Sequence, residues 1–174
     1  MTLKSMTTST LLAIALSALP AASFAATNQS AEIMKDLEAR AGDAADQAAE
    51  IQASVFSSNT SWEVHADKLQ AMKDDVNDMS RLLSRLDEMR AQLGPEDREV
   101  VDRASALLKE MAANTTTAVQ YLNTDQQNFW TPSYRKSVEN LVNESNQLSA
   151  ALNHVIALDK TRTREKHLEK SLEQ

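Results

Sequence analysis

Apolar side chains recur at alternating spacings of three and four residues over most of the chain after residue 30. This spacing places them on one stripe of an α-helix. The first two stripes are Met34, Leu37, Ala41, Ala44, Ala48, Ile51 and Val55, then Trp62, His65, Leu69, Met72, Val76, Met79, Leu83, Leu86 and Leu93. The other two are Val101, Ala104, Leu108, Met111, Thr115, Ala118 and Leu122, then Tyr134, Val138, Leu141, Ser145, Leu148, Leu152 and Val155. The pattern predicts four amphipathic helices.

The breaks between the stripes carry residues that begin and end helices. Thr60 and Glu63 have the spacing of a capping box, in which each side chain bonds a free amide of the other residue. The second helix is predicted to run for about 32 residues, roughly 48 Å, and to end at Gly94 in a left-handed conformation before Pro95. Thr131 is expected to cap the fourth helix.

Short connections between four helices of similar length favour antiparallel neighbours. The predicted fold is therefore all-α, an up-down-up-down four-helix bundle over residues 26–158. Two alternatives remain open, a helical hairpin completed by dimerisation and an extended two-helix rod.

The stripe of the fourth helix becomes polar after Leu158, where its positions are taken by Asp159, Arg162, Lys166 and Glu169. Residues 159–174 are therefore predicted to form a charged helical tail in solvent. The alternative is a docking segment that uses Leu168 and Leu172.

The N-terminus has the pattern of a secretory signal peptide, predicted over residues 1–25. Lys4 precedes an apolar run from Leu11 to Leu19, then Pro20 and small residues before Ala26. The run is shorter than the roughly 20 residues that span a bilayer, so a retained membrane anchor is the minor alternative. We expect an exported protein, periplasmic or extracellular, without stable membrane insertion after cleavage.

Composition narrows the chemistry that the chain can perform. The chain has no cysteine, which excludes disulfides, lipid attachment through cysteine and thiolate catalysis. Asp and Glu number 25 against 18 Lys and Arg, a net charge of −7. Loss of Lys4 with the signal peptide would make the chain more negative still. A phosphate backbone would be repelled, so nucleic acid is not an expected partner.

Aromatic residues are rare, and the antiparallel arrangement brings those of the mature chain to one pole of the bundle. The candidate binding surface there comprises Phe56, Trp62, His65, Tyr121, Phe129, Trp130 and Tyr134. Wide rings can plug the end of a bundle where its helices diverge. Alternatively, some rings stay exposed and bind a peptide, a lipid tail or a flat ligand.

No arrangement of residues predicts an enzyme, a cofactor or a metal site. Glu63 and His65 lack the Glu-x-x-His spacing of metal-binding bundles, and no serine has a matching histidine and acid. Met34 and His154 could flank a haem at one pole, but the heptad places His154 on the outer face. We expect a non-enzymatic bundle, monomeric or homodimeric, that binds an unknown protein or small apolar ligand. A sensor-type bundle and a haem or metal carrier are the alternatives.

Overall fold

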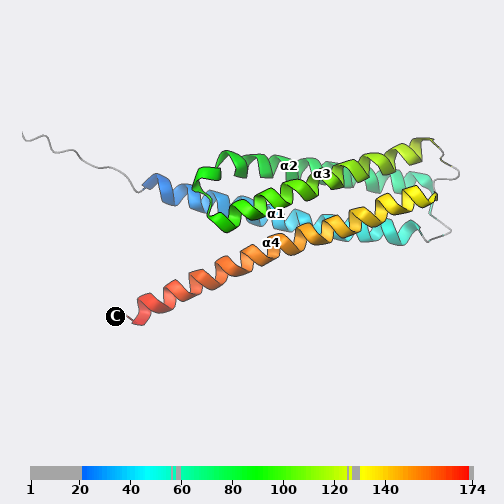
Figure 1. Ribbon diagram of the computed structural model, residues 1–174. Helices are drawn as coiled ribbons and strands as arrows, with labels where there is room; N and C mark the ends of the chain where they lie inside the picture. The colour runs from blue at the N-terminus through cyan, green and yellow to red at the C-terminus, as the bar shows by residue number, and fades with distance from the viewer. Residues whose placement is uncertain (1–20, 56, 58–59, 125, 127–129, 173–174) are drawn as a thin grey trace, which may run out of the picture.

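The structure, a computed structural model, describes residues 21–172 except 56, 58–59, 125 and 127–129, and without the side chains of residues 21–28 and 166. The fold is all-α. Its helices are α1 (Ala21–Val55), α2 (Trp62–Glu88), the 3-10 helix η1 (Arg90–Gln92), α3 (Pro95–Thr124) and α4 (Pro132–Leu172). Each long helix packs mainly against two others, in the cyclic order α1, α2, α3, α4. Successive helices run in opposite directions (Figure 1).

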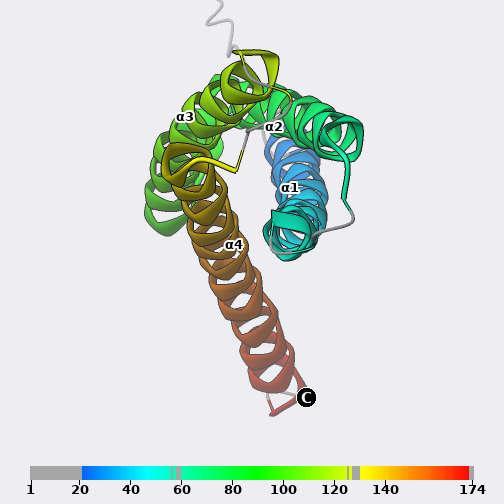
Figure 2. The same ribbon diagram turned by 90° about the vertical axis from the view of Figure 1, so that its right-hand side faces the viewer.

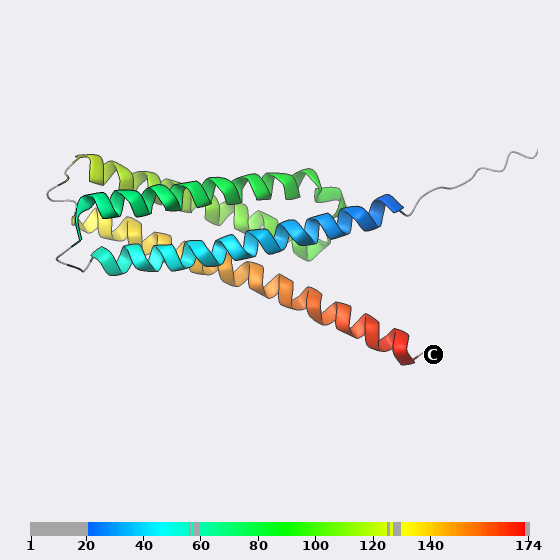
Figure 3. The same cartoon turned by 180° about the vertical axis from the view of Figure 1, so that it is seen from behind.

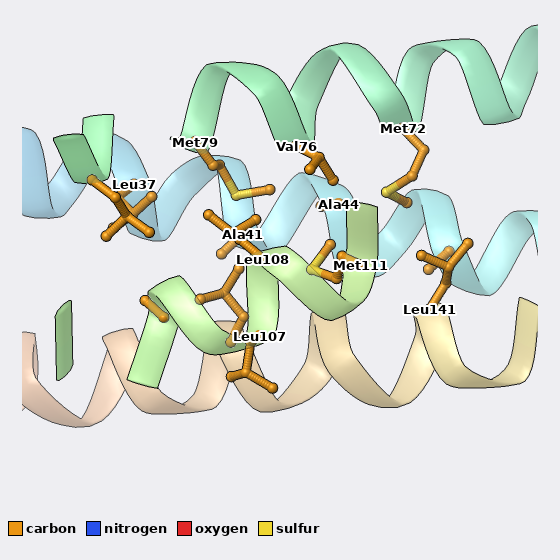
Figure 4. Packing of buried hydrophobic residues seen from close by; sticks show 14 of the residues in the cluster. Leu37, Ala41, Ala44, Met72, Val76, Met79, Leu107, Leu108, Met111 and Leu141 are labelled. Carbon is orange, nitrogen blue, oxygen red and sulfur yellow. The ribbon is translucent and has the colours of Figure 1, made fainter. Parts of the chain in front are cut away.

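The core contains the residues that the four stripes predicted. Every stripe residue is buried except Trp62, which is partly buried against the core. The side chains from all four helices point into the space between them (Figure 4). Full burial of one leucine contributes about 1.5–3 kcal/mol, so these stripes supply the main driving force for packing. Ala41, Ala44 and Ala48 are fully buried, which confirms the predicted alanine seam of α1.

The starts of α2 and α4 differ in how well the sequence predicted them. Thr131 caps α4 as expected, because its Oγ1 accepts a hydrogen bond from the Tyr134 N–H at 3.2 Å. The capping box at α2 is wrong, since the N-cap is Ser61, not Thr60. Glu63 instead accepts a hydrogen bond from the Ser61 side chain, which lowers the pKa of Glu63.

The connection between α2 and α3 also departs from the prediction. α2 ends at Glu88, and η1 occupies the turns that were expected to extend it. Arg90 interrupts the apolar stripe and forms two hydrogen bonds with Asp102 of α3, at 2.7 and 2.8 Å. Gly94 does not take a positive φ, so the predicted left-handed helix end is wrong. The Gly94 N–H donates a hydrogen bond to Asp97 Oδ2 at 3.2 Å, at the start of α3.

The start of α1 and the end of α4 lie toward the pole opposite the aromatic residues (Figure 1). α1 begins at Ala21, so most of the predicted signal peptide lies outside the described residues. α4 continues past the bundle, and its described residues beyond Leu158 are exposed. The end of α4 diverges from the start of α1 (Figure 3). Within the described range, no helix is both long and apolar enough to cross a membrane.

Candidate functional site

The structure brings the described residues of the predicted aromatic surface to one end of the bundle. In Figure 2 this end of the bundle faces the viewer. We call it the aromatic pole and define it by Trp62, His65, Tyr121, Trp130 and Tyr134. Phe56 and Phe129, which completed the predicted surface, lie outside the described residues.

His65 of α2 and Tyr134 of α4 form the centre of the aromatic pole. Both side chains are fully buried, and His65 Nδ1 lies 2.8 Å from the Tyr134 hydroxyl oxygen in a hydrogen bond. The Trp130 ring packs edge-on against His65, with 5.2 Å between ring centroids. His65 therefore links the starts of α2 and α4, helices that are not neighbours in the ring order.

Burial keeps both groups at the centre of the aromatic pole uncharged. Burial lowers the pKa of His65, and the positive charge of Lys68 lowers it further, while the Ser54 carbonyl acts in the opposite direction. Burial raises the pKa of Tyr134. The pair is thus a neutral hydrogen-bonded link at neutral pH. Trp62, Tyr121 and Trp130 stay partly exposed around it.

The opposite pole contains a crevice of about 780 Å³, which the sequence had not predicted. The beginning of α1, the α2–α3 connection, the first turn of α3 and the end of α4 line it. We call it the terminal crevice. Its apolar floor includes Met34, Leu93, Val155 and Ile156, of which the first three are almost fully buried. α1 and α4, which both contribute residues to its lining, diverge at this pole (Figure 3).

Carboxylates on the α3 side of the terminal crevice gather around one arginine. Arg162 binds Glu96 at 2.5 Å, and this contact, with the charges of Asp159 and Asp97, raises the pKa of Arg162. Burial raises the pKa of Asp97, and the charges of Asp159 and Glu96 raise it further, while the Gly94 N–H and, to a smaller extent, Arg162 act in the opposite direction. Arg162 therefore offsets only part of the negative charge near the first turn of α3.

Three basic residues that line the terminal crevice lack such partners among the described residues. Lys35 of α1 and Lys160 and Arg164 of α4 line the crevice and are exposed. None of the three forms a salt bridge with any residue that the structure describes. His167 lies on the same rim. The lining thus carries three unpaired cations against two carboxylates, although the whole chain is acidic.

Other polar features of the bundle lie between neighbouring helices. Glu144 of α4 is nearly buried and accepts a hydrogen bond from Asn114 of α3 at 2.7 Å. Burial raises the pKa of Glu144. A hollow of about 360 Å³ between α2 and α3 contains Ser80, Ser84, Asp87 and Lys109 together with Leu83 and Leu108. It has less than half the volume of the terminal crevice.

The described part of the chain contains no group of three or more His, Asp or Glu side chains that could hold a metal ion. Met34 is buried in the crevice floor, while His154 is exposed on α4 and does not line the crevice. The heptad prediction that His154 points outward is therefore confirmed. These two residues are not arranged to ligate one haem iron.

Comparison with known proteins found no match to a family model, to a curated protein or to a solved structure. The geometry of the two poles therefore carries the functional argument.

Proposed function

We propose that this chain is an exported, non-enzymatic bundle that acts by binding, and that the terminal crevice is its binding site. The observation that carries the proposal is the crevice of about 780 Å³ with its apolar floor. Small-molecule sites have volumes of roughly 300–1,000 Å³, mostly apolar walls and a few convergent polar groups. The terminal crevice has all three properties.

A neutral solvatochromic dye such as Nile red tests binding at the terminal crevice. Ala31 lines the crevice and is exposed, so Ala31→Phe should fill part of it and weaken dye binding. Ala49→Phe is the matched control, because Ala49 is an exposed alanine of the same helix that does not line the crevice. Equal dye binding by the two variants would refute the proposed site.

The aromatic pole is the second candidate binding site, because its two indole rings are only partly buried. Trp62 and Trp130 are the only tryptophans of the chain, and both lie at this pole. A ligand at the aromatic pole should therefore change tryptophan emission and its quenching by acrylamide. A ligand in the terminal crevice should leave both nearly unchanged, since no Trp, Tyr or Phe is among the described residues that line it.

The export proposal rests on residues 1–25 and has its own test. Expression of the full chain, followed by fractionation and intact-mass measurement, should give a mature chain that begins at Ala26. Recovery of an uncleaved chain from the cytoplasm would contradict export without affecting the binding proposal.

A further inference from the structure

We propose that the terminal crevice binds a single-chain anionic amphiphile, a long-chain carboxylate whose tail lies on the apolar floor and whose head meets the cationic rim. The inference rests on the proposed binding function and adds the chemical class of the ligand. It draws on two independent features of the crevice, its apolar floor and its unpaired cations.

The apolar floor of the terminal crevice provides the surface on which the hydrocarbon tail would lie. Met34, Leu93 and Val155 come from α1, the α2–α3 connection and α4, and Ile156 extends the apolar surface along α4. A chain laid on this surface removes apolar area from water, and each buried CH₂ tightens binding by up to about fourfold. The volume of about 780 Å³ suits one small molecule.

The basic residues of the rim are the reason to expect a negatively charged head group. Lys160 and Arg164 are four residues apart and therefore lie on the same side of α4, and Lys35 is on α1 across the crevice. Asp97 and Asp159 also line the crevice, but Arg162 lies near both and offsets part of their charge. The lining therefore offers a negatively charged head three exposed cations, from which a carboxylate can accept hydrogen bonds.

The experiment compares three amphiphiles of equal chain length on the mature protein by isothermal titration, each below its critical micelle concentration. Dodecanoate should bind at least about fivefold more tightly than dodecanol, and dodecyltrimethylammonium should bind most weakly. Higher ionic strength should weaken only the binding of dodecanoate, because salt screens exposed charges. Lengthening the carboxylate from ten to twelve carbons should tighten binding.

Charge-matched variants locate the selectivity. Lys160→Gln with Arg164→Gln should weaken dodecanoate at least about fivefold and leave dodecanol unchanged. Lys73→Gln with Arg85→Gln is the control, because both residues are exposed on α2, form no salt bridge with a described residue and do not line the crevice. Equal loss in both double variants would overturn the proposal, since net charge alone would then explain the affinity.

The remaining outcomes separate this inference from the proposed function. If dodecanol binds as tightly as dodecanoate and Ala31→Phe weakens both, the binding site stands and anion selectivity fails. If no probe binds, both proposals fail. Binding to anionic vesicles without binding of monomeric dodecanoate would assign the crevice to a membrane surface and overturn the inference. A dimer that Ala31→Phe dissociates would assign it to a second copy of the chain, with the same consequence.

Discussion

The two poles of the bundle differ in how their helix ends are held together. At the aromatic pole, Tyr134 of α4 reaches His65 of α2 across the bundle, and Trp130 packs against the same histidine. At the opposite pole the buried floor is aliphatic, and α4 becomes polar after Leu158. Large rings close one end, whereas α1 and α4 separate at the other.

The difference indicates where a ligand can bind without disrupting the core. Rings that fill the space between helices stabilise the fold, so a ligand that displaced them would have to offset the stability that they contribute. A crevice that already exists can receive a ligand without that cost. The aromatic pole is thus the stronger structural element, and the terminal crevice is the stronger candidate binding site.

Truncation of Tyr134 should have the largest effect on stability. Tyr134→Ala removes a fully buried ring and should lower the free energy of unfolding by about 3–5 kcal/mol, as for other buried aromatic residues. Ile156→Ala, at the half-buried floor of the terminal crevice, should cost only about 1 kcal/mol. Urea denaturation measures both. Equal losses would show that the two poles are equally well packed.

Breaking the hydrogen bond between His65 and Tyr134 should have an intermediate effect. His65→Leu and Tyr134→Phe each leave a buried polar partner without this bond, at a cost of about 1–3 kcal/mol. The double variant should cost less than the sum of the two, with a coupling energy of about 1 kcal/mol. Strict additivity would mean that the bond adds nothing to stability.

Acid should weaken the aromatic pole through the same histidine. Because burial lowers the pKa of His65, the unfolded chain binds its proton first as the pH falls below about 6.5, the ordinary value. The stability of the neutral form is then lost, by at most about 1.4 kcal/mol per pH unit, until the folded pKa is reached. Acrylamide quenching of Trp62 and Trp130 should rise over this window.

His65→Leu is the control for the pH dependence of stability, because it removes the titrating histidine. Asp97 and Glu144 have raised pKa values, so protonation of these carboxylates acts in the opposite direction as the pH falls. Their contribution is present in both the wild type and the variant and cancels in the difference. An unchanged pH profile in His65→Leu would assign the acid response to other groups.

The sequence predicted which residues of this fold are buried, because heptad spacing alone determines which side chains share a face. The sequence did not predict correctly where α2 ends. Arg90 could be recognised as an interruption of the stripe, but its partner Asp102 lies on α3, and only tertiary packing brings the two together. α2 ends at Glu88, just before this contact.

The contacts and shape of the two candidate sites likewise depend on tertiary packing, which the sequence pattern does not specify. Antiparallel order was enough to expect His65, Trp130 and Tyr134 at one pole, although not the hydrogen bond between His65 and Tyr134. The terminal crevice depends on the angle at which α4 leaves α1, which residue spacing does not specify. The available signal was the change from Val155 to Asp159 and Arg162 on the stripe, since a polar stripe gives α1 no apolar surface to pack against.

Deletion of residues 160–174 should have the smallest effect on stability. It should nevertheless distinguish the two poles, because it changes ligand binding at the terminal crevice only. The described residues of this segment are exposed, and its salt bridge to Glu96 through Arg162 is about half exposed on both sides. Such pairs contribute about 0–1 kcal/mol, so the midpoint of urea unfolding should barely move. Dodecanoate binding should nevertheless weaken at least about fivefold, because Lys160 and Arg164 are removed. Arg162→Gln in the full chain is the comparison variant and should reproduce the small stability change. It should weaken dodecanoate less than the deletion does, because it removes the charge that offsets Asp97 and Asp159 but leaves Lys160 and Arg164 in place. A large loss of stability on deletion would show instead that the tail packs on the bundle and closes the crevice.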